Sequence, residues 1–103
     1  MIKLSVMYPH NEGAKFDFDY YLGRHFDLVQ QKWGGLMKDA YVTRGLSGGD
    51  PGSSPAFHVM AHITFASLDD LNQAVSSHGA ELFADVPNFT DITPLVQVSE
   101  VLG

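Results

Sequence analysis

Residues 56–65 constrain the fold more than any other segment, because their alternation describes a strand without a charged face. One set of alternate positions is apolar: Phe57, Val59, Ala61, Ile63 and Phe65. The other set is His58, Met60, His62 and Thr64, with no Lys, Arg, Asp or Glu. Successive side chains point to opposite faces of a sheet, and a face open to water usually carries charge. We therefore expect this second face to be covered, and a second copy of so short a chain is its natural cover.

The first half of the chain predicts a strand, a helix and a second strand. Residues 2–8 and 38–46 alternate as strands do. Between them, Asp17 is a favourable N-cap, and Gly34-Gly35 is a stop signal for a helix. The residues that recur at helical spacing between these two signals are Phe18, Leu22, His25 or Phe26, Val29 and Trp33.

The second half repeats this order after the breaker-rich turn at 48–55. Residues 56–65 are the third strand and residues 94–102 the fourth. Ser67 predicts the start of a second helix and Gly79 its end, with 80–84 compatible with one more turn. The residues expected to face inward from this helix are Leu68, Leu71, Ala74 and Val75.

The order βαββαβ is the ferredoxin-like arrangement, so we predict an α+β fold in a single domain, residues 1–103. Right-handed crossovers place both helices on one face of a four-stranded antiparallel sheet and leave the other face bare. The bare face would carry the uncharged residues of the third strand, joined from neighbouring strands by Ser5, Met7, Gln97 and Ser99.

Composition excludes several classes of function. Twelve acidic and six basic residues give a net charge of −6, which is unfavourable for nucleic acid and for anionic membrane surfaces. Cysteine is absent, so disulfides, thiolate metal sites and cysteine nucleophiles are excluded. No signal peptide or membrane-spanning run is recognised, and we expect a soluble cytoplasmic protein.

His25 is the leading candidate for chemistry. It lies four residues after Tyr21, so the two share a helix face. A His among aromatic neighbours can exchange protons near neutral pH, but a partly buried structural His fits the same pattern. Both interpretations of His25 stay open.

Two other motifs are better explained by structure than by chemistry. His58 and His62 are spaced as a helical metal pair, but four residues of strand span roughly 13 Å. That separation is too wide for one ion with bonds of about 2 Å, so no metal site is predicted. Gly45-Leu46-Ser47-Gly48-Gly49 matches the nucleophile elbow, yet a turn follows it where the elbow requires a helix.

A polar segment before the last strand holds Asp85 and Asn88, which can orient a His or simply stabilise a loop. Tyr41 on the second strand can donate a hydrogen bond to a ligand oxygen or pack as a core tyrosine. The chain has no phosphate-binding loop or dinucleotide fingerprint, and we expect no cofactor.

Four segments of the chain resemble the EthD family of the dimeric α+β barrel superfamily: Ile2–Pro9, Phe16–Leu22, His25–Val29 and, most specifically, His78–Asp91. The family often has Pro two residues after the helix His, where this chain has Asp27. The EthD protein accompanies a cytochrome P450 system that degrades ethyl tert-butyl ether. Relatives include lactone isomerases and cofactor-free monooxygenases and cyclases, which place a small apolar ligand between helices and sheet.

The resemblance implies a homodimer with such a pocket in each protomer. The lactone isomerases use a His on the first helix and a Tyr on the second strand, to which His25 and Tyr41 correspond. A cofactor-independent enzyme would then act on a lactone, quinone or polyketide-like metabolite. His25 would move a proton and Tyr41 would bind the oxyanion, while the residues near the ligand would be Tyr21, His62, Asp85 and Asn88.

The alternative is a non-catalytic accessory or carrier protein that serves an oxygenase system, so whether the chain is an enzyme stays open. An RNA-binding module shares the βαββαβ order but needs exposed aromatic and basic residues on its open face. Phe57 and Phe65 lie in the apolar set, and the net charge is −6. We therefore set the RNA-binding interpretation aside.

Overall fold

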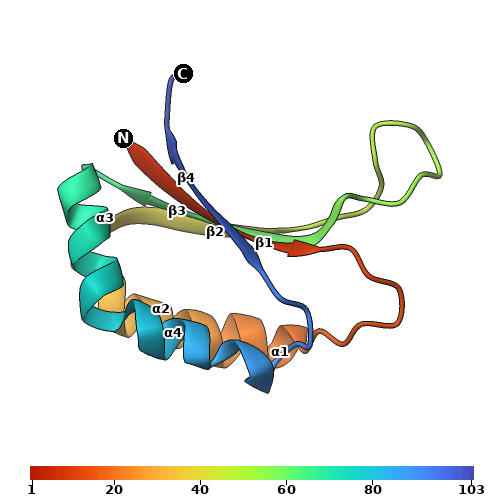
Figure 1. The fold of residues 1–103 in the computed structure, drawn as a ribbon, viewed down its shortest axis with the longest axis horizontal. Helices are drawn as coiled ribbons and strands as arrows, with labels where there is room; N and C mark the ends of the chain where they lie inside the picture. The colour runs from red at the N-terminus through yellow and green to blue at the C-terminus, as the bar shows by residue number, and fades with distance from the viewer.

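A computed structural model describes residues 1–103 and confirms the predicted ferredoxin-like order. The four strands form one antiparallel sheet in the order β2-β3-β1-β4. Their bounds are β1 Ile2–Pro9, β2 Met37–Arg44, β3 Phe57–Phe65 and β4 Leu95–Glu100. Both helices cover the same face of this sheet, and the opposite face is bare (Figure 1).

Each helix is interrupted by one wide, π-helical turn. The first consists of α1 Phe18–Tyr20, the π turn η1 Tyr21–His25 and α2 Phe26–Trp33. The second consists of α3 Leu68–Ala74, the π turn η2 Val75–Gly79 and α4 Ala80–Ala84, followed by the short 3₁₀ helix η3 Val86–Asn88. The predicted N-caps are confirmed, since the side chains of Asp17 and Ser67 accept hydrogen bonds from the backbone N–H groups of Tyr20 and Asp70. None of these helices is both long and apolar enough to cross a membrane.

The core lies between the helices and the sheet. From the two central strands it takes the alternate residues that the pattern assigned to it: Leu4, Val6 and Tyr8 of β1, and Val59, Ala61, Ile63 and Phe65 of β3. Val29 and Trp33 of α2 pack on this layer with Leu71, Ala74 and Leu82 of the second helix. The apolar alternation of β3 therefore faces the helices from Val59 to Phe65, as predicted, whereas Phe57, which pairs with Pro9 beyond a shift in register, is not part of the core.

The second helix does not stop at Gly79, where the stop signal predicted its end, whereas the further turn expected over 80–84 is confirmed as α4. Gly79 has helical backbone angles, and the helix continues through Ala84. A Cβ at position 79 would come within 3.2 Å of Val75 Cγ1, so the glycine allows close packing inside the helix. The predicted inward face is also only half right: Leu71 and Ala74 are buried, whereas Leu68 at the helix start and Val75 at the π turn are exposed.

The position of His58 differs from the expectation as well. Tyr8 pairs with Val59 and Pro9 with Phe57, so His58 is the extra residue of a bulge. Its ring lies 5.6 Å from the rings of both Phe16 and Phe18, which precede and begin the first helix. A bulge shifts the alternation of a strand. His58 therefore leaves the bare face, and Met60, His62 and Thr64 remain on it.

Candidate functional site

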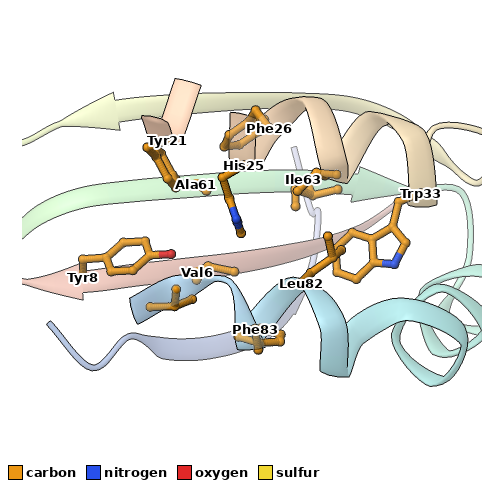
Figure 2. Close-up of a pocket in the computed structure, with 12 residues that line it drawn as sticks. Val6, Tyr8, Tyr21, His25, Phe26, Trp33, Ala61, Ile63, Leu82 and Phe83 are labelled. Atoms are coloured by element: carbon orange, nitrogen blue, oxygen red, sulfur yellow. The ribbon is translucent and has the colours of Figure 1, made fainter. Parts of the chain in front are cut away.

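A cavity lies between the two helices and the sheet (Figure 2). The centre of a water molecule can move through about 30 Å³ of this cavity. The sheet contributes residues such as Val6, Tyr8 and Ala61, and the first helix contributes Tyr21 and His25. Most lining residues are buried, but Phe26 of α2 and Phe83 of α4 are half-buried. These two rings mark the mouth of the cavity.

The π turn of the first helix positions the two polar residues of the cavity wall that come from this helix. Tyr21 and His25 are the buried residues of η1, and the backbone N–H of Phe26 donates to the carbonyl of Tyr21 across five residues. The two rings stack at 5.4 Å with an angle of 12° between their planes, and Phe89 lies 4.8 Å from the His25 ring. Aromatic groups on both sides thus hold the imidazole in one orientation. Single wide turns of this kind are frequent at functional sites.

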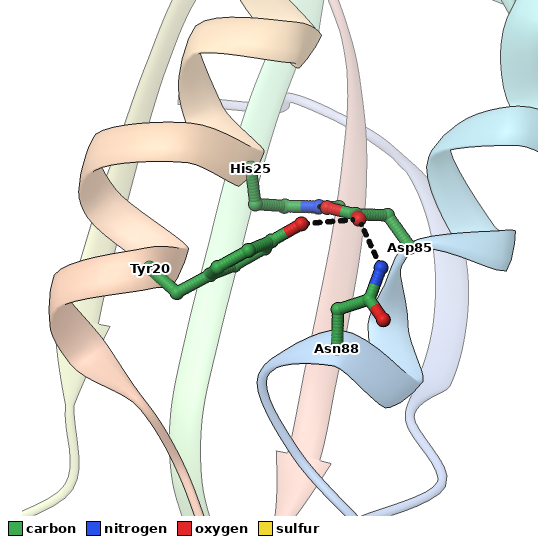
Figure 3. Close-up of polar contacts among 4 residues, drawn as sticks. All are labelled: Tyr20, His25, Asp85 and Asn88. Atoms are coloured by element: carbon green, nitrogen blue, oxygen red, sulfur yellow. Dashed lines mark hydrogen bonds and ion pairs between the residues drawn. The ribbon is translucent and has the colours of Figure 1, made fainter.

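Asp85 connects the two helices through three hydrogen bonds (Figure 3). Its Oδ2 lies 3.0 Å from Nδ1 of His25. Its Oδ1 accepts hydrogen bonds from the Tyr20 hydroxyl at 2.7 Å and from Asn88 Nδ2 at 2.8 Å. Both partners of the His25–Asp85 pair are largely buried, with side chains 10 % and 14 % exposed. The Asp85 carboxylate, directly after α4, therefore makes hydrogen bonds to three side chains.

These contacts keep Asp85 ionised. Burial raises the pKa of the Asp85 carboxyl, but hydrogen bonds from Asn88, His25 and Tyr20 outweigh it, and the net pKa lies below the ordinary 3.8. The same Tyr20–Asp85 bond raises the pKa of the Tyr20 hydroxyl, which stays a donor. An ionised Asp85 accepts the Nδ1 proton of His25, which leaves Nε2 as the unprotonated nitrogen of a neutral ring. His25 can then act as a base toward the cavity that it lines.

The lowered pKa of Asp85 predicts how folding stability responds to acid. Such a carboxyl adds stability above its ordinary pKa of 3.8, and this stability is lost as pH falls through the folded value. We expect the stability difference between wild type and Asp85→Asn to shrink as pH is lowered from about 7 to about 3. Urea unfolding followed by circular dichroism measures it, with the exposed Asp50→Asn as the control. A difference that stays constant over this range would contradict the assignment.

The structure brings Tyr21, His25, Asp85 and Asn88 together, but it separates them from Tyr41 and His62. His62 pairs with Ser5 on one side and with Tyr41 on the other, and all three alternate with core residues. They lie on the bare face, where Ser5 Oγ is 3.0 Å from His62 Nδ1. Lys3 Nζ donates to the Tyr41 hydroxyl at 3.3 Å. Burial and Lys3 lower the pKa of His62.

This separation corrects the expected partnership of Tyr41 and His62 with His25. Their side chains project from the sheet away from the helices, so neither lines the cavity of its own protomer. Tyr41 alternates with the inward residues Ala40 and Val42, so strand alternation alone directs its side chain to the other face of the sheet. This signal was present in the sequence.

Two residues of the site were not predicted: Tyr8 and Tyr20. Tyr8 occupies an apolar position of the first strand and lines the cavity. Tyr20 directly precedes the π turn and binds Asp85. No group of three or more His, Cys, Asp or Glu side chains has the arrangement of a metal site.

Comparisons with known proteins agree with this fold. The model of the EthD domain matches residues 11–93. An EthD-like protein from Ralstonia eutropha JMP134 is 41% identical, with a TM-score of 0.91 over 99% of this chain and 92% of that one. An ethyl tert-butyl ether degradation (EthD) family protein from Bacillus halodurans C-125 is 25% identical, with a TM-score of 0.75 over 99% of both chains.

A more distant solved structure shares the fold alone. SnoaB, a cofactor-independent oxygenase from Streptomyces nogalater, is 8% identical, with a TM-score of 0.60 over 97% of this chain and 90% of that one. The search of curated proteins gave no match. The EthD match spans most of the chain, and the structural similarity to the Ralstonia protein extends over nearly all of it. The chain therefore belongs to the EthD family.

Proposed function

We propose that this protein binds a small, largely apolar, oxygenated metabolite in the cavity between helices and sheet, and that His25 transfers a proton on it without a cofactor. The observation that carries this proposal is the His25–Asp85 pair in the wall of an apolar cavity. A carboxylate that holds Nδ1–H of a His orients the ring and stabilises its protonated form during proton transfer. The lining residues offer apolar contact around this single base.

The class of metabolite follows from the same lining. No Lys or Arg lines the cavity, so an anionic ligand would be buried without a counter-charge, which is costly. Neutral lactones, quinones and polyketide-like rings satisfy both the apolar wall and the base. SnoaB supports the proposal only as a fold-level analogy, since its name records cofactor-independent oxygenation on this fold.

The alternative is a carrier or accessory protein for an oxygenase system in ether degradation. The wall of the cavity favours it, because most lining residues are aliphatic or aromatic and such a wall can retain a ligand without turnover. The Bacillus relative takes its family name from ethyl tert-butyl ether. The two functions differ in whether a bound compound leaves chemically changed.

A binding screen with product analysis separates these functions. Lactones, quinones, polycyclic phenols and ether-degradation intermediates are tested for thermal stabilisation of the protein, and each stabilising compound is then analysed for product. We expect a compound that both stabilises the protein and is converted. Stabilisation without any product would support the carrier, and no stabilisation by any neutral compound would refute a ligand in this cavity.

We also propose that the bare face of the sheet is covered by a second copy of the chain. One row across this face contains Tyr41, His62, Ser5 and Gln97, which carry no formal charge when His62 is neutral. Ser5 and Thr64 are buried even in one protomer. Lys3 and Asp39 lie next to Thr64 in the register, so the charges of this face lie toward one end.

Met60→Glu tests this interface. Met60 pairs with Met7 and Thr43 near the middle of the bare face, and a carboxylate buried there in each copy opposes association. We expect wild type to have twice the protomer mass of 11.3 kDa by light scattering, and Met60→Glu to have the protomer mass. Leu46→Glu, at a loop position 84% exposed, is the control and is expected to stay dimeric. A monomeric wild type at micromolar concentration would refute the interface.

A further inference from the structure

Two tyrosines, Tyr8 and Tyr21, bring phenol groups to the cavity wall beside His25. Each is 1% exposed, although a tyrosine hydroxyl needs a hydrogen-bond partner when it is buried. Their rings pack edge to face at 6.0 Å. Figure 2 shows the Tyr8 hydroxyl and the imidazole of His25 both directed toward the middle of the cavity, Tyr8 from the sheet and His25 from the helix. Three polar groups thus converge on a cavity that is otherwise apolar.

Burial affects the hydroxyl groups of both tyrosines. Burial raises the pKa of Tyr21 far above its ordinary value, and the contact with the Tyr8 hydroxyl raises it further. Burial also raises the pKa of Tyr8, while Tyr21 lowers it slightly. Both phenols are therefore protonated, and each hydroxyl can serve as a hydrogen-bond donor.

The hydroxyl hydrogen of Tyr8 therefore remains available. The side-chain hydrogen bonds around the cavity are received by Asp85 and by the backbone carbonyl of Ala74, and Tyr8 donates none of them. A ligand that filled the cavity without an acceptor atom would leave this buried donor unpaired, at a cost in binding. The cavity thus favours a ligand with a hydrogen-bond acceptor near Tyr8 and, because no Lys or Arg lines the wall, with no negative charge.

From these contacts we infer that Tyr8 is the oxyanion donor of the site and that its ligand is a neutral, enolisable carbonyl compound such as a cyclic ketone or lactone. This inference rests on the proposed function, because proton transfer by His25 needs an oxyanion donor and Tyr8 is that donor. Tyr8 takes the role that the family resemblance implied for Tyr41. Tyr21 is a positioning residue, since its ring packs edge to face on Tyr8 and stacks on His25.

The reaction is balanced without an external reagent. Nε2 of His25 removes a proton from the carbon next to the carbonyl. The electron pair of that C–H bond forms a carbon–carbon double bond, and the carbonyl π electrons move to oxygen. The resulting enolate oxygen accepts the hydrogen bond of Tyr8. Return of the proton from Nε2 to the same carbon gives exchange, and its return to a conjugated carbon gives isomerisation. A raised pKa keeps Tyr8 protonated, so it remains a donor throughout.

Deuterium exchange tests this assignment directly. Cyclohexanone, 3-cyclohexen-1-one and γ-butyrolactone are incubated with the protein in D₂O, and proton NMR follows loss of the signal next to the carbonyl. Cyclohexane and cyclohexanecarboxylate are the matched binding controls, because they lack the acceptor or carry a charge. We expect the ketones and the lactone to stabilise wild type more than either control does, with exchange faster than in buffer.

Four variants distinguish the roles. Tyr8→Phe is expected to slow exchange about 100-fold, because one oxyanion donor is lost. Tyr21→Phe should slow exchange less, and His25→Gln should abolish catalysed exchange. Tyr41→Phe is the matched control on the opposite face and should exchange as wild type does. Circular dichroism checks that each variant is folded.

The outcomes separate failure of this inference from failure of the proposed function. If Tyr8→Phe exchanged at the wild-type rate while His25→Gln lost catalysed exchange, the role of Tyr8 would be overturned and proton transfer by His25 would stand. If catalysed exchange were lost in Tyr41→Phe but kept in Tyr8→Phe, the oxyanion donor would be Tyr41 on the bare face. No exchange in wild type with any carbonyl probe would overturn the ligand class, and a quinone or phenol converted in the separate screen would then still support the proposed function.

Discussion

His25→Gln is expected to lower the turnover of a converted ligand by about 10²- to 10⁴-fold, while the affinity for that ligand changes only a few-fold. The substitution removes the base and keeps a polar side chain of similar reach. Asp85→Asn is expected to act in the same direction, because an amide can donate to Nδ1 of His25 and favour the tautomer that protonates Nε2. Initial rates and ligand affinities, measured separately for each variant, test this prediction.

The chain contains a matched control for these substitutions. His78 Nδ1 lies 2.7 Å from Glu81 Oε1, but both side chains are exposed at the surface, and neither lines the cavity. His78→Gln therefore removes a His–carboxylate pair of the same chemistry at a different place, and we expect turnover as in wild type. Equal product formation by His25→Gln and His78→Gln would remove His25 from the chemistry and favour the carrier.

Trp33→Ala is expected to destabilise the fold by about 3–5 kcal/mol, the largest single effect on stability that we predict. Trp33 is 2% exposed and packs against Phe65 of β3 at 5.9 Å. Its Nε1–H donates to the carbonyl of Ala74 at 2.8 Å, directly before the π turn of the second helix. The indole thus connects both helices to the sheet, and its removal leaves a cavity and takes one hydrogen bond from the carbonyl of Ala74.

Trp33→Phe separates the two contributions. It keeps most of the ring contact and removes only the donor, so we expect a loss of about 0.5–1.5 kcal/mol from the hydrogen bond to the carbonyl of Ala74. Leu68→Ala, at a position that is half exposed, is the control and should change stability far less. Urea denaturation at fixed protein concentration gives the free energy of unfolding for all three variants. A loss below about 1 kcal/mol in Trp33→Ala would contradict the central place of this side chain.

Much of the fold was predictable because it depends on short-range patterns. The apolar alternation of Val59, Ala61 and Ile63 indicated a strand and its buried face, and the side chains of Asp17 and Ser67 marked helix starts by local hydrogen bonding. The prediction failed at Gly79, where a stop signal lies inside a helix. The helix continues past this glycine and buries Leu82 in the core, and that tertiary contact overrides the local preference.

The candidate site was predictable only in part. Tyr21 and His25 were expected on one helix face, and Asp85 and Asn88 were considered as partners for a His. Tyr41 was assigned by family resemblance, although strand alternation places it on the bare face. Tyr8 was counted as core, since only the folded cavity places its hydroxyl beside His25.

The alternating residues and the helix caps could be identified from the chain alone, because they are properties of neighbouring residues. The acidic composition was likewise enough to make nucleic-acid binding unfavourable. The folded arrangement was needed to show that Asp85 meets His25 across 60 positions, that π turns shift the helix faces, and that Tyr8 and His25 share one cavity while Tyr41 and His62 do not. The physical reason is that a hydrogen bond or a cavity requires contact in space to within a few tenths of an ångström, and spacing along a chain does not set distances between its separate elements.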